Sequence, residues 1–417
     1  MTSSAVPVTA CRACGGRLVA GFCDLGVQPV ANSYVPADRA DAPEPRFPLR
    51  AVVCDDCRLV QLDTVVDAEG IFSDYAYFSS ASASWLDHAA RFARDMTARF
   101  GLGAASFVVE VASNDGYLLK NFVAAGIPCL GIEPAANVAE VARAAGVPTE
   151  TFFMGEATAR ALVARRGHAD LVAANNVFAH VPAINDFTAG LAALAGPRGV
   201  VSIEQPHLVR MVDGVQFDTI YHEHYAYWSL LAMERILARH GLRVFDVERL
   251  STHGGSIRVL SSAADRGTSA ALAELRAEEA ARGLGGDAFY AGFDARVRTT
   301  LADFRAWLWQ ARVAGRRIGA YGAAAKGNTF LNAAGATAAD IVAVADRSPA
   351  KQGRMLPGSR IPVVTPEALL AMALDDILVL PWNIGAEIAQ QLRAGGFRGR
   401  ILTAVPEMRE IAPEVPA

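Results

Sequence analysis

The sequence has little of what nucleic-acid-binding proteins and membrane proteins need. Only three of its 417 residues are lysine (Lys120, Lys326 and Lys351), and acidic residues outnumber basic ones, for a net charge of −4. That balance argues against a nucleic-acid partner. No apolar run reaches the roughly 18 residues of a membrane-spanning helix, and residues 1–10 lack a basic head followed by a long apolar core. We therefore expect a cytoplasmic protein without a signal peptide or a membrane span. The sequence does not indicate an oligomeric state, and a monomer is compatible with it.

The chain has the composition and the pattern of a folded protein with several domains. Hydrophobic residues make up 52% of it and charged residues 20%, as in globular proteins, and its length allows two to four domains. After residue 80, strand and helix patterns alternate: a strand at 107–111, a loop at 112–116, a helix at 117–125 and a strand at 129–132. Such alternation predicts a parallel, doubly wound sheet.

A second α/β pattern follows an alanine-rich helical connector at about 264–312 and begins near residue 316. We therefore predict the α/β class with three parts. These are a cysteine-bearing module (1–75), a central Rossmann-like domain (76–250), and the helical connector with a second Rossmann-like domain (251–417).

Four of the six cysteines form two C-x-x-C pairs, Cys11 with Cys14 and Cys54 with Cys57. Two such pairs commonly bring four thiolates to one tetrahedral zinc ion. The alternative is two disulfides or unpaired thiols, and a reducing cytoplasm disfavours disulfides. We predict structural zinc that holds the fold rather than performing chemistry. Cys23 and Cys129 have no such partner, and we interpret both as ordinary buried residues.

The segment EVASNDG (110–116) ends the first strand of the central pattern and opens a helix, so backbone N–H groups face a crevice. Glu133 ends the next strand, where a carboxylate can accept hydrogen bonds from ribose hydroxyls. The loop lacks the GxGxxG of dinucleotide sites, so it suits a ligand with a ribose and no phosphates, such as S-adenosylmethionine (SAM). NAD(P) and a purely structural turn are the alternatives. The predicted cofactor contacts are Glu110, Ala112, Asn114, Asp115, Gly116, Glu133 and Asn175.

Several segments, in order along nearly the whole chain, resemble one family. They are CRACGG, DLGVQPVANSY and CDDCRLVQL; VEVASNDGYLL and GIEP; YAYFSSAS, NNVFAHVP, FDTIYHEHYAYWSL and THGGSIR; GAYGAAAKGNTFLN and DRSPAKQGRMLPGSRIPV. The family is that of the SAM-dependent C-methyltransferases of nucleotide-linked deoxysugars, which includes the tetronitrose 3-C-methyltransferase and the noviose C-methyltransferase. Ala112 departs from it, because many members have glycine there.

The resemblance implies a catalytic centre in the segment 217–230. A sugar carbon attacks a methyl group only as an enolate, which requires a base, and an imidazole suits that role near neutral pH. The family's base corresponds to His224. Glu223 would orient it or hold a sugar hydroxyl or amino group. Tyr221 and His180 would flank the keto oxygen, and Tyr77 would lie in the substrate pocket. His222 is the second candidate for the base and a possible substrate contact. The other aromatic residues of the segment read as packing residues.

The resemblance also implies a nucleotide diphosphate, that of a dTDP-sugar, between the two large domains. Lys326 and Asn328 follow a glycine-containing turn at a helix start, which favours an anion; a glycine turn with a solvated lysine is the alternative. Lys351 is a weaker candidate, and His253 belongs either to the substrate site or to a glycine turn.

The leading hypothesis is therefore methyl transfer from SAM to ring carbon C3 or C5 of a nucleotide-linked 4-keto-6-deoxysugar. Three other hypotheses remain open: an O- or N-methyltransferase of the same fold, a non-catalytic nucleotide-sugar or zinc-dependent module, and an NAD(P)-dependent oxidoreductase, which the absent GxGxxG disfavours.

Overall fold

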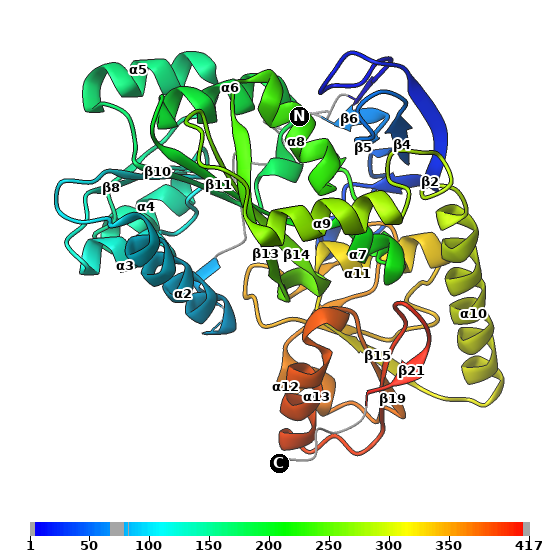
Figure 1. Cartoon of the computed structure of the whole chain (residues 1–417). Helices are drawn as coiled ribbons and strands as arrows, with labels where there is room; N and C mark the ends of the chain where they lie inside the picture. The colour runs from blue at the N-terminus through cyan, green and yellow to red at the C-terminus, as the bar shows by residue number, and fades with distance from the viewer. Residues whose placement is uncertain (1–4, 67–78, 82, 412–417) are drawn as a thin grey trace.

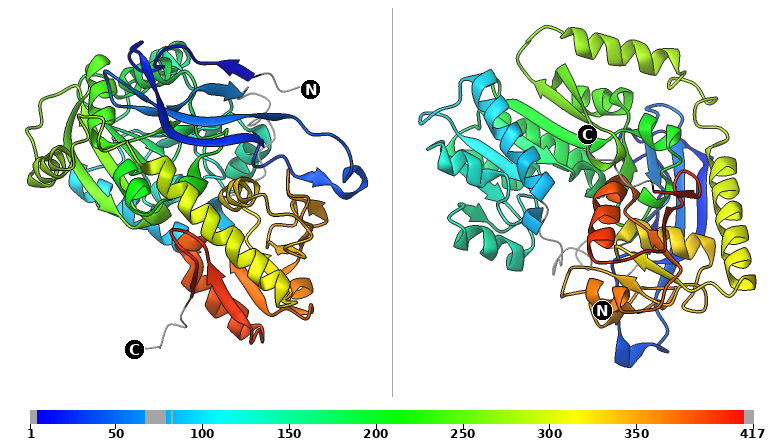
Figure 2. Two further views of the ribbon diagram at one scale, coloured as in Figure 1. Left: turned by 90° about the vertical axis from the view of Figure 1, so that its right-hand side faces the viewer. Right: turned by 90° about the horizontal axis from the view of Figure 1, so that it is seen from below.

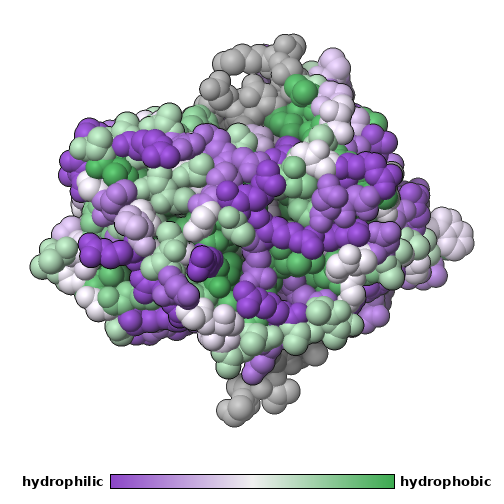
Figure 3. Space-filling view, turned by 45° about the horizontal axis from the view of Figure 1, so that its top comes forward, coloured by the Kyte–Doolittle hydropathy of each residue, from purple (hydrophilic) through white to green (hydrophobic). Residues whose placement is uncertain are grey.

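The computed structural model describes residues 5–66, 79–81 and 83–411 (Figure 1). A central α/β domain, a second α/β domain nearer the C-terminus and an N-terminal antiparallel module are packed together. The predicted fold class is confirmed. No helix in the described part of the chain combines the length and the apolar character that crossing a membrane would require. The face in Figure 3 is largely polar, with smaller apolar areas between the polar ones.

The central sheet has seven strands whose order reverses beside its first strand. In space they run β13 (Arg243–Leu250), β14 (Ser256–Ser262), β11 (Val200–Pro206), β10 (Leu171–Asn175), β7 (Val108–Val111), β8 (Cys129–Ile132) and β9 (Thr149–Glu150). The strands from β11 to β9 are parallel, whereas β14 and β13 are antiparallel to their neighbours. The reversal between β7 and β10 creates a crevice at the carboxyl ends of these strands, where open α/β sheets bind ligands.

Helices cover both faces of this sheet, which explains why its central parallel strands are buried and mostly apolar. α2 (Ala83–Phe100) and α3 (Leu119–Ala124) pack on one face, and α5 (Glu156–Arg166), α6 (Ile184–Ala195) and α8 (Leu230–Arg239) pack on the other. The strand side chains alternate between the two cores.

The C-terminal domain repeats the same design in a six-stranded sheet. Its order is β18 (Val363–Val364), β16 (Val344–Ala345), β15 (Ile318–Tyr321), β19 (Asp376–Val379), β20 (Arg400–Thr403) and β21 (Arg409–Glu410). All neighbours except β20 and β21 are parallel. The order reverses between β15 and β19, so a second crevice lies beyond Tyr321 and Val379.

The predicted connector forms α9 (Ala270–Ala281) and α10 (Phe293–Val313), as its composition indicates. The hairpin of β13 and β14 was not predicted. It places residues 256–262 in the central sheet, so that sheet continues past the predicted domain boundary at 250.

The N-terminal module is an antiparallel sheet of β2 (Leu18–Pro29), β4 (Arg46–Cys54) and β5 (Val60–Leu62). Its fourth strand is β12 (Ala226–Tyr227), which comes from the central domain's candidate catalytic segment. β3 (Val35–Pro36) pairs with β17 (Arg354–Met355) of the C-terminal domain. The module therefore contacts both large domains, as the blue strands in both panels of Figure 2 show.

Candidate functional site

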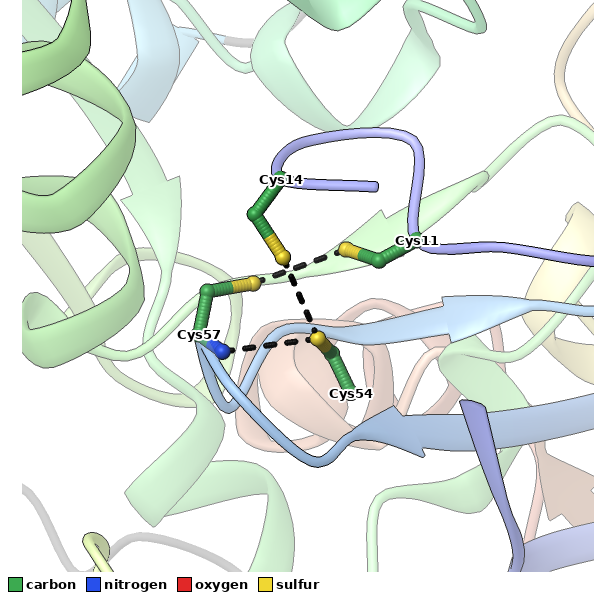
Figure 4. A group of neighbouring side chains, drawn as sticks. All are labelled: Cys11, Cys14, Cys54 and Cys57. Atoms are coloured by element: carbon green, nitrogen blue, oxygen red, sulfur yellow. Dashed lines mark hydrogen bonds between the residues drawn. The ribbon is translucent and has the colours of Figure 1, made fainter. Parts of the chain in front are cut away.

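The four predicted metal ligands converge at the edge of the N-terminal module (Figure 4). The Sγ atoms of Cys11 and Cys57 are 3.5 Å apart, those of Cys14 and Cys54 are 3.4 Å apart, and all four lie within 4.8 Å of one another. A tetrahedral zinc ion with Zn–S bonds of about 2.3 Å requires sulfur atoms roughly 3.8 Å apart. The four-thiolate structural zinc site is confirmed, and we call residues 5–66 the zinc module.

The predicted cofactor loop follows β7 at the first crevice and has an unusual backbone. Ala112, Asn114 and Gly116 have φ values of 56°, 50° and 78°, in the left-handed region. A Cβ atom on Gly116 would lie 2.8 Å from Val147, so this glycine serves helix packing as well as the turn. The methyl group of Ala112 is accommodated, at the cost of an unfavourable conformation.

Glu133 holds this loop in place from the end of β8. Its carboxylate accepts hydrogen bonds from the backbone N–H groups of Asn114 and Ala135, both at 2.9 Å. Burial raises the pKa of Glu133, and these backbone bonds oppose the increase. Burial also raises the pKa of Glu110, inside β7, well above its usual range. Glu133 is thus preorganised as a hydrogen-bond acceptor at the crevice.

The residues of this crevice suit a ligand that is rich in hydrogen-bonding groups. Within the described part of the chain, Oδ1 of Asp115, Oδ1 of Asn175 and the whole amide group of Asn176 are buried without a hydrogen-bond partner. Asn176, which sequence reasoning missed, also has a positive φ of 54°. Buried polar atoms without partners are costly, so these atoms fit a cofactor with amino, carboxylate and ribose groups. The other oxygen of Asp115 accepts from the backbone N–H of Ser80 at 3.0 Å.

The candidate base lies in a fixed tautomer beside this crevice. Nδ1 of His224 is 2.9 Å from the carbonyl oxygen of Thr219. A carbonyl oxygen only accepts hydrogen bonds, so Nδ1 carries the proton, and Nε2 accepts from the Tyr221 hydroxyl at 2.6 Å. Burial lowers the pKa of His224 well below its usual value, with His180 adding to the decrease. His224 is therefore neutral near pH 7 and able to accept a proton.

His180 lies against the same pair. Its ring centroid is 4.6 Å from that of His224, and its Nδ1–H donates to the Glu223 carbonyl at 2.8 Å. Burial lowers its pKa to about 4. Because Nδ1 holds the proton, Nε2 of His180 is an acceptor in this tautomer. The predicted place of His180 beside the keto oxygen stays a prediction.

Glu223 contacts the zinc module rather than His224. Its Oε1 accepts from the Asn32 amide at 3.1 Å, while its Oε2 is buried without a partner within the described part of the chain. Burial raises the pKa of Glu223 to about 7. The predicted orienting bond from Glu223 to His224 is therefore replaced by the Thr219 carbonyl, and holding a substrate group remains its predicted role.

His222 and Tyr77 stand apart from this cluster for different reasons. The His222 ring packs edge-on against Phe47 of β4, at 6.0 Å between centroids, and burial lowers its pKa to about 4. The ring lies at the interface with the zinc module, and both its nitrogens are buried without a hydrogen-bond partner among the described residues. Its predicted role as second candidate for the base or as a substrate contact stays a prediction. Tyr77 lies outside the described residues.

The second crevice contributes Lys326 and Trp382. Nζ of Lys326 lies 4.9 Å from the centre of the Trp382 ring and is buried without a hydrogen-bond partner in the described part of the chain. Trp382 donates its indole N–H to the carboxylate of Asp218 at 2.7 Å. Asp218 lies three residues before Tyr221 in the sequence. Burial lowers the pKa of Lys326, and Asp218 opposes the decrease. The charge of Lys326 in turn favours neutral His224 and His253.

The remaining predicted substrate residues have different surroundings. The Asn328 amide donates to the Ala31 carbonyl at 3.0 Å, and the residue is only 1% exposed, so it joins helix α11 (Ala325–Ala334) to the zinc module. Lys351 donates to the Ala323 carbonyl at 2.8 Å. His253, whose φ of 54° is left-handed, lies 5.2 Å from Trp85 between ring centroids.

A buried network of charged residues, which the sequence did not predict, lies next to His253. Glu204, near the carboxyl end of β11, accepts from Arg258 at 2.8 Å and lies 2.9 Å from His88. Thr252, next to His253, bonds the same carboxylate at 3.2 Å. These residues are far apart in sequence and follow no short motif. Only a carboxylate at the end of a predicted strand could have indicated them.

Another carboxylate fixes the end of the catalytic segment. Glu279 of α9 accepts from the backbone N–H groups of Leu230 and Leu231, both at 2.8 Å, and lies 2.7 Å from His207. It satisfies the otherwise unpaired N–H groups at the start of α8. The alanine-rich connector thus clamps the segment that carries His224.

Comparisons with known proteins match three consecutive parts of the chain. Residues 11–72 match a family model described as "Putative zinc binding domain", residues 85–247 match "Methyltransferase domain", and residues 251–406 match "C-methyltransferase C-terminal domain". C-methyltransferase NovU from Streptomyces niveus is 35% identical over 414 residues, which cover 98% of each chain.

Among solved structures, magnesium protoporphyrin IX methyltransferase from Synechocystis PCC 6803 with bound SAH is 16% identical, with a TM-score of 0.34. The alignment covers 42% of this chain and 82% of that one. An S-adenosylmethionine-dependent methyltransferase from Clostridium acetobutylicum ATCC 824 is 11% identical, with a TM-score of 0.35, over 43% of this chain and 92% of that one.

Replacing Ala112 by glycine relieves its left-handed backbone. We expect the Ala112→Gly variant to be more stable than the wild type by about 1 kcal/mol, net of the extra entropy of glycine in the unfolded chain. Chemical denaturation measures the difference. Ala161→Gly, on an exposed position of α5, is the control and loses about 1 kcal/mol. A loss at both positions would contradict the strain at Ala112.

Glu223 gives stability a specific pH dependence. Because burial raises its pKa to about 7, the folded chain holds a proton that the unfolded chain releases near pH 4.5, and stability falls as pH rises through that window. We expect the Glu223→Gln variant to exceed the wild type at pH 8 by on the order of 2–3 kcal/mol, and by much less at pH 5. Denaturant titrations at both pH values test this. Glu140→Gln, on exposed α4 (Ala136–Ala144), should show no such difference, and a pH-independent effect of Glu223→Gln would contradict the assignment.

Proposed function

The chain belongs to the C-methyltransferase family that it matches over nearly its whole length, and from this premise we propose a substrate and a route. Membership confirms the predicted class, a SAM-dependent methyltransferase. We propose that the methyl group goes to ring carbon C3 or C5 of a nucleotide-linked 4-keto-6-deoxysugar through an enolate. NovU, whose name states C-methylation, supports a carbon acceptor.

The observation that carries this proposal is the Tyr221–His224 pair. Methylation of carbon requires removal of a proton from a carbon atom beside a ketone, and the pair supplies a neutral base in a fixed tautomer. Since Nε2 of His224 is engaged by the Tyr221 hydroxyl, the proton passes through that hydroxyl. The tyrosine oxygen takes the carbon-bound proton while its own proton moves to Nε2. The resulting imidazolium keeps its Nδ1–H on the Thr219 carbonyl.

The cofactor would lie at the first crevice, held by Glu133, Asp115, Asn175 and Asn176, and supplies an electrophilic methyl group when bound. The loop after β7, with Glu110, Ala112, Asn114 and Gly116, shapes that crevice. These side chains position the cofactor and exclude water, and none of them needs to move a proton.

Lys326 supports the negative charge that the enolate develops. Its buried ammonium group lies over the ring of Trp382, whose indole N–H donates to Asp218, and its charge helps to lower the pKa of His224. In a low-dielectric site a fixed cation stabilises an oxyanion strongly. We therefore propose that Lys326 acts toward the sugar rather than the diphosphate predicted from the sequence. Lys351, which donates to the Ala323 carbonyl just before α11, remains our candidate for the nucleotide.

A panel of dTDP-4-keto-6-deoxysugars, with and without a 3-amino group, incubated with SAM tests the function. NMR locates the new methyl group. We expect methylation at a ring carbon and, without SAM, exchange of the adjacent proton in D₂O. Methylation at oxygen or nitrogen without exchange would show an O- or N-methyltransferase. No product with any sugar of the panel would reject this substrate class.

Removing the base should separate chemistry from binding. We expect the His224→Asn and Tyr221→Phe variants to bind SAM normally and to lose about 10²- to 10⁴-fold in turnover and in deuterium exchange. Calorimetry and single-turnover kinetics measure the two effects. His168→Asn, in the exposed turn before β10, is the control. Wild-type exchange in the Tyr221→Phe variant would show that the proton reaches His224 directly.

A further inference from the structure

Arg12 of the zinc module contacts the backbone of the loops that form the candidate catalytic centre. It stands between Cys11 and Cys14, yet its side chain leaves the thiolate cluster. The guanidinium donates to the carbonyl oxygens of Val181 at 3.5 Å and Pro182 at 3.3 Å, and also to that of Tyr225.

These carbonyl groups belong to the two loops that carry the candidate catalytic histidines. Val181 directly follows His180, and Tyr225 directly follows His224. The loops also share a backbone hydrogen bond from Tyr225 N–H to the Ala179 carbonyl at 2.7 Å. One planar cation therefore bridges the two segments whose rings lie 4.6 Å apart.

The guanidinium itself is held in a single orientation. Oε1 of Gln61 accepts from both the backbone N–H and Nε of Arg12, at 3.2 and 3.1 Å. The Asn185 amide donates to the carbonyls of Arg12 and Ala13, at 2.7 and 3.0 Å. The ring of Tyr225 lies 5.6 Å below the guanidinium carbon. The planar guanidinium has five N–H donors in a fixed geometry and can bond all of these acceptors at once. A lysine ammonium group, with three donors on one atom, cannot.

We propose that Arg12 is a positioning residue that transmits the geometry of the zinc site to His180 and His224. The proposal rests on the proposed function for the roles of these histidines. A partly buried cation that pairs with neutral carbonyls is an expensive way to stabilise a fold. The same cation is an effective way to set the distance between two loops. The zinc site thereby influences turnover without touching the substrate.

The test compares Arg12→Gln and Arg12→Lys with the wild-type enzyme. We expect Arg12→Gln to lose about 10- to 100-fold in kcat, with SAM affinity and zinc content close to wild type, and Arg12→Lys to fall between them. The NMR titrations of the His180 and His224 imidazoles should shift in Arg12→Gln. Arg17→Gln, which removes an exposed arginine of the same module paired with Asp55, is the matched control and should behave as wild type. Gln61→Met, which removes the acceptor that orients the guanidinium, should give a smaller loss and decides the question if Arg12→Gln does not fold.

Three outcomes would overturn the proposal: wild-type kcat in Arg12→Gln and Gln61→Met, a loss of kcat that only parallels loss of zinc, or unchanged imidazole titrations. If the wild-type enzyme methylates none of the keto-sugars, the proposed function fails. The imidazole titrations then still decide whether Arg12 positions the two histidines.

Discussion

Four thiolates within 4.8 Å of one another repel unless a cation lies between them. Two pairs of cysteines 40 or more residues apart must therefore share a metal ion, which holds the edge of the zinc module together. That edge packs against the central domain, because Cys11, Ala13 and Cys57 share a hydrophobic core with Phe178 and Trp228. β12 then extends the module's sheet. The metal and the catalytic segment belong to one packed unit.

Inside that unit, burial rather than direct charge pairing sets the chemistry of the site. It lowers the pKa values of His180, His224 and His253 and raises that of Glu223. The imidazoles are therefore neutral near pH 7, and the pKa of the Glu223 carboxyl group lies close to that pH. Burial does not decide which nitrogen of His224 carries the proton. The backbone carbonyl of Thr219 does, because it accepts a hydrogen bond from Nδ1–H.

Features with a local sequence signal were predictable. The C-x-x-C spacing identified the zinc ligands, and alternating strand and helix patterns identified β7 and β8 within one residue at either end. Contacts between distant residues had no such signal. Arg12, Asn32 and Trp382 each meet the catalytic segment over more than 160 residues of sequence. The β13–β14 hairpin was not predicted either, since its burial depends on the neighbouring strand β11 as well as on its own pattern. A matched motif also does not reveal which way a polar side chain points, as the bond of Asn328 to the zinc module shows.

The pairing of β3 with β17 has a mechanical consequence. Together with the Asn328 bond to Ala31, it connects the zinc module to the C-terminal domain, while β12 connects the module to the central domain. Two α/β domains joined only by a linker can swing apart to exchange ligands. Here, separating the two domains would break the backbone hydrogen bonds between β3 and β17 or those between β12 and β5. Access to the buried histidines is cheaper through rearrangement of individual loops than through separation of whole domains, so the distance between the two crevices stays constant through a catalytic cycle.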